Sequence, residues 1–294
     1  MNRTLILGSG GFLGSNFADF IGSNAFFHTT KKSDSQGENF LVSNFLKDGI
    51  EPLVKYIIEN NITHIINCVA LASIDECEKK PPVAFQLNSD LPKELAKISK
   101  KFQIKLVHIS TDAVFDGMTQ FNTELDFPNP KTVYGISKLE GENNILEENP
   151  HSIIVRVNFF GHKSEGNSLF DFFLQNLIKS NPIQGYTDIH FTTLYVRETV
   201  RIICELIDRN LEGIIHVVGN DRISKYEFGR LVAKVWGFNE SLILEGIYGK
   251  SGKIPNRPRD LSLSNKKLLE LGISVQSLLE SLSELRTTMK FKVK

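Results

Sequence analysis

The first half of the chain alternates short apolar runs with amphipathic segments, and this alternation limits the fold more than any other feature. Apolar runs of strand length cover residues 4–7, 25–29, 64–69, 105–109 and 152–157. Between them, apolar residues recur with helical spacing over residues 12–21, 50–60, 81–102 with a break at Pro92, and a segment that ends near Asn149. Apolar strands joined by helices form a parallel sheet that is covered on both faces. With right-handed crossovers, the pattern predicts a doubly wound, Rossmann-like α/β fold.

The second half of the chain is less regular. Helices are expected over residues 168–180 and 198–209, and a strand over 214–218. Ser224 and Glu227 have the spacing of a capping box that opens a further helix. We therefore expect one α/β domain over residues 1–158 and a smaller C-terminal lobe over 159–294, parts of which return to the core.

The composition excludes several function classes. Lys plus Arg and Asp plus Glu each total 34, so the formal net charge is zero and nothing favours nucleic acid or a membrane surface as partner. Arg3 is followed by a brief apolar run that Gly8 interrupts, unlike a signal peptide, and we expect a cytoplasmic protein. The three cysteines and seven histidines match no common metal-binding pattern, so we expect reduced thiols and no metal site.

A glycine-rich turn follows the first expected strand and opens the first expected helix. Gly8, Gly11 and Gly14 have the spacing G-x-x-G-x-x-G. Glycines let the backbone turn sharply and approach a pyrophosphate, which the N-terminus of the helix attracts. We expect a nicotinamide dinucleotide on this turn and beside the residues after the 64–69 strand, and the alternative is a merely structural turn. The expected cofactor contacts in these two segments are Gly8, Gly10, Gly11, Phe12, Leu13, Gly14, Ala70, Leu71 and Ala72.

The end of the second strand bears on the choice of nicotinamide cofactor. An acid there would accept hydrogen bonds from the ribose 2′-hydroxyl of NAD, but the chain reads His-Thr-Thr-Lys-Lys-Ser over residues 28–33. Lys31 and Lys32 suit a 2′-phosphate, which favours NADPH and adds Lys31 to the cofactor contacts. NADH stays open, because two lysines also occur in ordinary solvated turns.

Two further motifs carry chemistry. Thr111 follows the 105–109 strand, while Tyr134 and Lys138 are four positions apart and share one face of a helix. A phenol beside an ammonium ionises more easily, so Tyr134 is expected to exchange a proton with a hydroxyl or carbonyl group. The Thr111 hydroxyl is expected to hold the same oxygen, and the three residues are the expected catalytic set.

These residues resemble the extended short-chain dehydrogenase/reductases that act on nucleotide sugars, and within them the dTDP-4-dehydrorhamnose reductases. The resemblance rests on the glycine turn and on the segments 67–75, 110–117, 133–142, 224–228 and 257–258. It implies that Tyr134 donates a proton, that Lys138 binds the nicotinamide ribose and lowers the pKa of the tyrosine, and that Thr111 holds the substrate oxygen. The implied reaction is NADPH-dependent reduction of a nucleotide-linked 4-keto-6-deoxy sugar.

The resemblance also implies substrate contacts. Asp112, Asn158 and Arg257 occupy positions that face the sugar nucleotide in the family, Arg257 as a ligand of the diphosphate. For Asp112, an equally good alternative is that it accepts hydrogen bonds from nearby backbone donors. For Arg257, the alternative is an ordinary solvated surface charge. The chain departs from the family pattern at Ile189 and in the strand that ends before Asn158, so the sugar and the base stay open.

Ala113 separates two activities of this class. The 4,6-dehydratases carry a glutamate after the Thr-Asp pair, whereas this chain has alanine, which cannot transfer a proton. Two alternatives to the reductase stay open: a nucleotide-sugar 4-epimerase that retains NAD, and a regulatory subunit similar to that of methionine adenosyltransferase. Members of the family often form homodimers through helices beside the Tyr134 segment, which makes a homodimer an expectation here.

Overall fold

The computed structural model describes residues 2–30, 39–163, 168–248 and 258–289. The chain divides into two compact units, which are treated separately below. The first unit comprises residues 1–114, 130–156 and 200–215, and the second comprises residues 115–129, 157–199 and 216–294.

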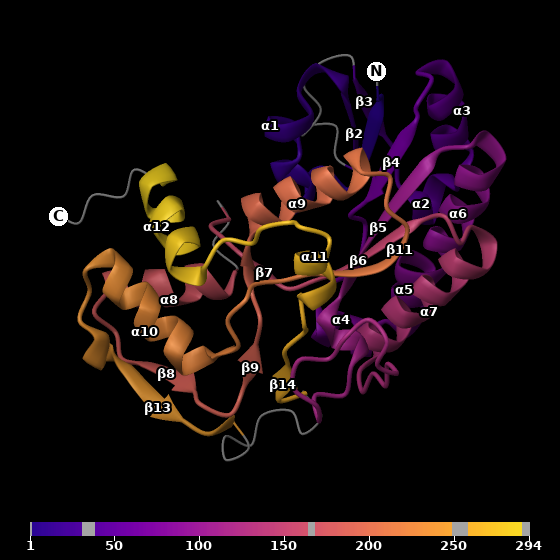
Figure 1. Cartoon of the computed structure of the whole chain (residues 1–294). Coiled ribbons are helices and arrows are strands. Elements are labelled where there is room, and N and C mark those ends of the chain that lie inside the picture. The colour runs from indigo at the N-terminus through magenta and orange to yellow at the C-terminus, as the bar shows by residue number, and fades with distance from the viewer. Residues whose placement is uncertain (1, 31–38, 164–167, 249–257, 290–294) are drawn as a thin grey trace. The chain divides into compact units, whose positions relative to one another are not determined.

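The first unit is built on a seven-stranded sheet with the strand order β11-β6-β5-β4-β1-β2-β3 (Figure 1). Strands β1 and β2, β1 and β4, β2 and β3, and β4 and β5 pair in parallel. From β1, strands β2 and β3 follow on one side of the sheet and β4, β5, β6 and β11 on the other. This reversal of strand order at β1 is typical of a doubly wound fold and confirms the predicted Rossmann-like class. The strands are β1 (Thr4–Leu7), β2 (Ala25–Thr29), β3 (Phe40–Val42), β4 (His64–Asn67), β5 (Lys105–Thr111), β6 (Ile153–Val157) and β11 (Gly213–Val217).

Helices cover both faces of this sheet. Leu5 and Leu106 of the strands share one buried apolar cluster with Leu53, Leu95 and Ile145 of α3, α6 and α7, while α9 crosses the other face (Figure 1). Full burial of each such side chain contributes roughly 1.5–3 kcal/mol. The helices are α1 (Ala18–Ile21), α2 (Phe45–Asp48), α3 (Glu51–Glu59), α4 (Ile74–Lys79), α5 (Pro81–Phe85), α6 (Leu91–Phe102) and α7 (Val133–Glu148).

The helix expected over residues 12–21 is shorter in the structure. The glycine turn leads into a 3-10 turn over Gly14–Asn16 and then into the four-residue α1. The side chains of Ser15 and Asn16 both donate to the carbonyl oxygen of Phe12, at 3.2 and 2.8 Å. Side chains of this kind compete with the backbone for the carbonyl that a regular helix needs. That competition explains why the prediction of a long helix was wrong here.

Pro92 does not break the helix expected over residues 81–102. A π-helical segment, Gln86–Asp90, joins α5 to α6, and Pro92 lies in the first turn of α6. The π-helical turn just before Pro92 widens the backbone hydrogen-bonding pattern at the point where proline has no N–H to donate.

The second unit holds three small sheets, with the strand orders β10-β7, β12-β9-β14 and β13-β8. Three of its helices begin with a complete capping box, at Ser168, Ser224 and Ser277, and the box at Ser224 was predicted. The elements are β7 (Phe159–Phe160), α8 (Leu169–Ile178), β8 (Ile183–Tyr186), β9 (His190–Phe191), β10 (Leu194–Tyr195), β12 (Ile223–Ser224), α10 (Lys225–Trp236), β13 (Ile243–Gly246), β14 (Asp260–Leu261), α11 (Lys266–Glu270) and α12 (Leu278–Thr288). Helix α9 (Val196–Asp208) carries the chain from this unit into the first.

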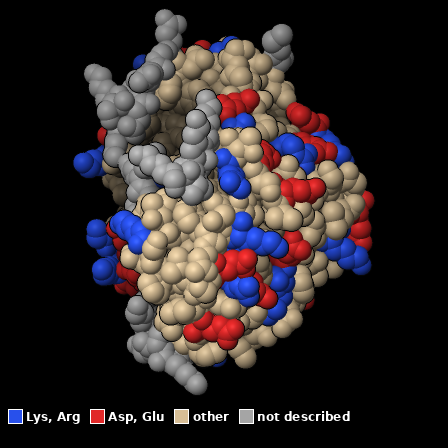
Figure 2. All heavy atoms as spheres, turned by 90° about the vertical axis from the view of Figure 1, so that its left-hand side faces the viewer, with Lys and Arg blue, Asp and Glu red and all other residues tan. Residues whose placement is uncertain are grey.

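On the face that Figure 2 draws, acidic and basic side chains are interspersed. Among the described residues, none of the helices has both the length and the apolar character that a bilayer crossing requires.

Candidate active site

Thr111 and Tyr134 meet at the carboxyl end of β5. Thr111 is the last residue of β5, and Tyr134 lies in the first turn of α7, which Thr132 caps by accepting from the backbone N–H of Gly135 at 3.1 Å. The Thr111 hydroxyl donates to Asp112 Oδ1 at 3.0 Å and accepts from the backbone N–H of Ala113 at 3.2 Å. The same hydroxyl lies close enough to the phenol of Tyr134 to influence its pKa. The structure therefore brings two of the three expected catalytic side chains close together.

The acidity of Tyr134 differs from the expectation. Burial raises the pKa of Tyr134 to about 12 and the charge of Asp112 raises it further, whereas the nearby Thr111 hydroxyl acts in the opposite direction. An easily ionised phenol was expected from the neighbouring Lys138, and that expectation was wrong for this state of the protein. The physical reason is that desolvation disfavours the phenolate more than the local donors favour it.

Lys138 lies one turn further along α7, with only 1% of its surface exposed. Its Nζ donates to the carbonyl oxygen of Ile109 at 2.7 Å and lies 3.0 Å from Nε2 of His108. Burial lowers the pKa of Lys138 to about 8, opposed by the charge of Glu142. An amine with this pKa changes its protonation near physiological pH, unlike an ordinary lysine.

A buried ion pair lies directly behind Lys138. Glu142, the next residue on the same face of α7, accepts from Nη2 of Arg156 at 2.7 Å and from Nε at 3.1 and 3.2 Å. Ser110 also donates to Glu142 Oε1. Because Glu142 and Arg156 are each about 1% exposed, this pair connects α7, β5 and β6 without competition from water.

The glycine turn lies at the same edge of the sheet, after β1. Gly8 has φ of 78°, in the left-handed region. Gly14 packs on the turn so closely that a Cβ would overlap the Gly8 carbonyl oxygen and lie 2.9 Å from its carbon. His28, at the end of β2, fixes the turn: its Nδ1 accepts from Gly8 N–H at 3.3 Å, and its carbonyl oxygen accepts from Ser9 N–H at 3.0 Å.

The segment after β4 is also fixed in place. Asn88 bonds both backbone groups of Leu71, at 2.9 and 3.1 Å, and donates to Ser137 of α7 at 3.0 Å. In open α/β sheets, ligands bind beyond the carboxyl ends of the strands near the point where strand order reverses. The tight backbone turn after β1, the fixed segment over residues 70–72 and the Tyr134–Lys138 face all occupy that edge. These residues fit a dinucleotide at this edge of the sheet.

Other expected site residues have different positions. Asp112 is bonded to Thr111 and is only 5% exposed. Asn158 belongs to the second unit, where its carbonyl oxygen accepts from Leu194 N–H at 3.0 Å. Lys31 and Arg257 lie outside the described residues.

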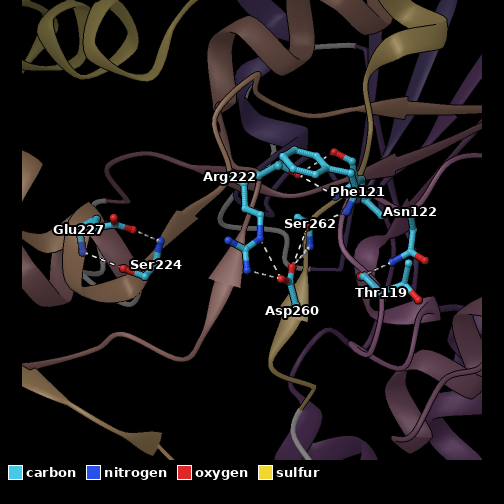
Figure 3. Close-up of polar contacts among 10 residues, drawn as sticks. Thr119, Phe121, Asn122, Arg222, Ser224, Glu227, Asp260 and Ser262 are labelled. Atoms are coloured by element: carbon cyan, nitrogen blue, oxygen red, sulfur yellow. Dashed lines mark hydrogen bonds and ion pairs between the residues drawn. The ribbon is translucent and has the colours of Figure 1, made fainter.

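The second unit has a polar cluster of its own (Figure 3). Two of its members, Asp260 and Ser262, follow Arg257 closely in the sequence. Arg222 donates to Asp260 Oδ2 at 2.8 Å, and Ser262 donates to Asp260 Oδ1 at 2.6 Å. The Ser262 hydroxyl accepts from the backbone N–H of Phe121 at 2.9 Å. Three segments distant in sequence are thereby fixed at the start of β14.

Sequence reasoning missed His108, Glu142 and Arg156. A signal was present for Arg156, because a charged residue inside the apolar strand Ile153–Val157 requires a buried partner. His108 gave no such signal, since histidine is common in half-buried strands.

The family model described as the RmlD substrate binding domain matches residues 1–290 of this chain. The chain belongs to this family. A relative, the probable low-salt glycan biosynthesis reductase Agl14 of Haloferax volcanii, is 31% identical over 242 residues, covering 80% of this chain and 80% of the relative. The methionine adenosyltransferase 2 subunit beta of Danio rerio is 31% identical over 294 residues, covering 94% of this chain and 86% of that protein.

The fold agrees with RmlD-family structures. The crystal structure of a dTDP-4-dehydrorhamnose reductase from Clostridium acetobutylicum aligns with a TM-score of 0.84 and 26% identity, covering 98% of this chain and 99% of that one. The resemblance stated from the sequence is thereby confirmed. As a member of the RmlD family with these neighbours, the chain is a nicotinamide-dependent oxidoreductase of the extended short-chain dehydrogenase/reductase type.

Proposed function

We propose that this protein reduces the keto group of a nucleotide-linked 4-keto-6-deoxy sugar with NADPH. The contact between Thr111 and Tyr134, one helical turn from Lys138, is the observation that carries the proposal. It provides a proton donor and a second hydroxyl for one substrate oxygen, at the sheet edge where the glycine turn suits a dinucleotide. The names of the reductases from Haloferax volcanii and Clostridium acetobutylicum support the same reaction class.

Tyr134 is the proposed proton donor. Because burial raises the pKa of Tyr134 to about 12, its phenol keeps its proton near neutral pH until negative charge develops on the oxygen it faces. The Thr111 hydroxyl would hold that oxygen and stabilise the developing charge. A bound nicotinamide would supply the hydride.

Lys138 is the proposed ligand of the nicotinamide ribose, from its buried position beside Ile109 and His108. Asp112, Asn158 and Arg257 are the proposed substrate contacts, which the sequence resemblance suggests. Ala113 supports reduction over dehydration, because its methyl group replaces the acid that elimination requires. NADPH is preferred over NADH in this proposal because residues 28–30, which end and follow β2, contain no carboxylate for a ribose 2′-hydroxyl.

The test is a panel of 4-keto sugar nucleotides with different bases, monitored by NADPH absorbance and product analysis. We expect oxidation of NADPH with at least one of them, and loss of at least about 100-fold in kcat for Tyr134→Phe with cofactor affinity retained. Wild-type protein that binds NADPH but reduces no keto sugar would contradict the proposal. NAD retained through purification would indicate the 4-epimerase alternative.

A regulatory subunit is the second candidate, favoured by the likeness to the methionine adenosyltransferase 2 subunit beta over 94% of this chain. It predicts a stoichiometric complex with a methionine adenosyltransferase catalytic subunit in a co-purification experiment. The reductase proposal predicts turnover without any such partner.

A further inference from the structure

Four groups form an unbroken hydrogen-bonded chain from β4 to α7. The backbone N–H of Val69 donates to Asn67 Oδ1 at 3.1 Å, and Asn67 Nδ2 lies 3.1 Å from His108 Nδ1. His108 Nε2 lies 3.0 Å from Lys138 Nζ. Asn67 and His108 have no exposed surface and Lys138 has 1%, so water cannot substitute for any of these partners.

The direction of this chain is fixed at its first member. A backbone N–H can only donate, so Asn67 must face Val69 with its oxygen and His108 with its NH2 group. The NH2 group can only donate, so His108 Nδ1 is the acceptor and carries no proton. A neutral imidazole then carries its proton on Nε2 and donates toward Lys138 Nζ.

The last contact is a hydrogen bond only if Nζ offers a lone pair. An ammonium has three N–H donors and no lone pair, whereas an amine has two donors and one lone pair. The amine form of Lys138 satisfies both of its contacts, since it still donates to the carbonyl oxygen of Ile109 at 2.7 Å. In the ammonium form, an N–H of Lys138 and the Nε2–H of His108 would face each other with no acceptor between them. Such an unsatisfied pair of donors is costly where water is excluded.

We propose that His108 is a positioning residue for Lys138: fixed by Asn67 with its proton on Nε2, it holds the Lys138 side chain as an uncharged amine before a cofactor binds. The proposal goes beyond the proposed function, on which it depends only for the role of Lys138 toward the nicotinamide ribose. Lys138 would take up a proton from solvent when ribose oxygens become available as acceptors for an ammonium. The catalytic face would thus acquire its positive charge together with its cofactor.

The other charged and titratable groups around Lys138 do not reverse this assignment. Glu142 on α7 and Cys68 after β4 favour the ammonium, yet burial outweighs them and lowers the pKa of Lys138 to about 8. This value alone leaves the ammonium in excess at pH 7, so the amine depends on the hydrogen bond donated by His108, which lowers the pKa of Lys138 further. Glu142 is also paired with Arg156 on β6, and Tyr134 on the preceding turn of α7 is a neutral phenol because burial raises its pKa. Burial lowers the pKa of His108 well below its usual value, so the imidazole is neutral whether or not Lys138 is charged.

The experiment is side-chain NMR of the full-length protein without cofactor or substrate. Histidine 15N spectra report the position of the ring proton, and we expect His108 to be the Nε2–H tautomer at neutral pH. The 13Cε signal of Lys138, assigned by its loss in Lys138→Met, gives the pH midpoint of the amine. In His108→Phe the amine loses its donor, so we expect this midpoint to rise by about one pH unit, a tenfold change in proton affinity.

The opposite arrangement makes opposite predictions. If Nε2 instead accepted from an ammonium, His108 would be the Nδ1–H tautomer and the midpoint would fall in His108→Phe. Either result would overturn the proposal, and the wild-type tautomer decides it even if the variant does not fold. His64→Phe on β4 is the matched control and should leave the Lys138 midpoint unchanged, because His64 contacts Thr63 instead. A negative sugar-nucleotide panel would not affect this result, since no substrate is used.

Discussion

Gly135 lies directly against the backbone of Ala113, with no room for a side chain between them. A Cβ at Gly135 would overlap the carbonyl oxygen of Ala113 and lie 2.8 Å from Cβ of Pro130. This close approach seats the first turn of α7 on the 3-10 turn Asp112–Val114 that follows β5. The contact between Tyr134 and Thr111 therefore depends on the absence of a side chain at the neighbouring residue.

Gly135→Ala should separate these two segments. Inserting a methyl group at a tight backbone contact typically costs about 1–3 kcal/mol, and here it would also move Tyr134 away from Thr111. We expect a lower free energy of unfolding in urea and a larger relative loss in kcat, because catalysis depends steeply on the distance between reacting groups. Ile136→Ala changes the next residue, which is 42% exposed, and should affect both quantities little. Equal effects of the two substitutions would show that the close approach does not position Tyr134.

The sequence was a good guide where the determinants are local. The apolar runs at β1 and β2 predicted strands with the bounds found in the structure, Thr4–Leu7 and Ala25–Thr29. The spacing of Ser224 and Glu227 predicted the capping box of α10, because both partners lie within one turn. The four-residue spacing of Tyr134 and Lys138 placed both on one helix, as observed.

It failed where the outcome depends on contacts between distant segments. The pKa of Tyr134 was expected to be lowered by Lys138, but burial raises it, and the charges of Asp112 and Cys77 raise it further. Lys138 itself turns its amine to Ile109 and His108, thirty residues away in sequence, which no local pattern reveals. The helix expected over residues 12–21 forms only in part, because the side chains of Ser15 and Asn16 bind the Phe12 carbonyl oxygen in place of a backbone N–H. Hydrophobic periodicity does not detect such a contact.

Arg156→Met should strongly destabilise the first unit. The substitution leaves the Glu142 carboxylate buried without its bidentate partner, and breaking a buried pair on one side costs about 3–5 kcal/mol. The double variant Glu142→Leu with Arg156→Met removes both charges and should be more stable than the single variant in urea unfolding. Lys55→Met, which breaks a surface pair whose side chains are 75% and 58% exposed, is the control and should cost at most about 0.5 kcal/mol. A double variant no more stable than Arg156→Met would contradict this account.

Gly14→Ala should weaken cofactor binding. Its Cβ would lie 2.9 Å from the Gly8 carbonyl carbon and 3.0 Å from Ser9 Cα, so the turn must open. Opening the turn costs about 1–3 kcal/mol. When this cost is added to the NADPH-bound state, the affinity for NADPH falls by roughly 5–150-fold. Titration of the variant by NADPH fluorescence measures the change. Ser15→Ala removes only an exposed hydroxyl and its 3.2 Å hydrogen bond to the Phe12 carbonyl oxygen, which Asn16 also binds, and should retain wild-type affinity. Unchanged affinity in Gly14→Ala would exclude a role of the turn in binding.

His28 should make the protein sensitive to mild acid. Burial lowers the pKa of His28 to about 4, below the value of 6.5 for an unfolded chain. Its Nε2 lies 3.0 Å from the carbonyl oxygen of Ser43 and its Nδ1 accepts from Gly8 N–H, so a second ring proton would displace the glycine turn. As pH falls from 6.5 toward 4, the unfolded chain binds a proton that the folded protein does not, and stability is lost over that window. The full difference in pKa corresponds to about 3 kcal/mol.

Urea unfolding of the wild type and of His28→Gln at several pH values between 7 and 4 isolates this contribution. The variant starts less stable at pH 7, because it loses the stacking of the imidazole on Phe45. It should then lose less stability on acidification than the wild type, so that the difference between the two narrows toward pH 4. His151→Gln, at a side chain that is 74% exposed, should keep the steep acid response of the wild type. Parallel pH profiles for the wild type and His28→Gln would show that His28 is not the group responsible for the loss of stability in acid.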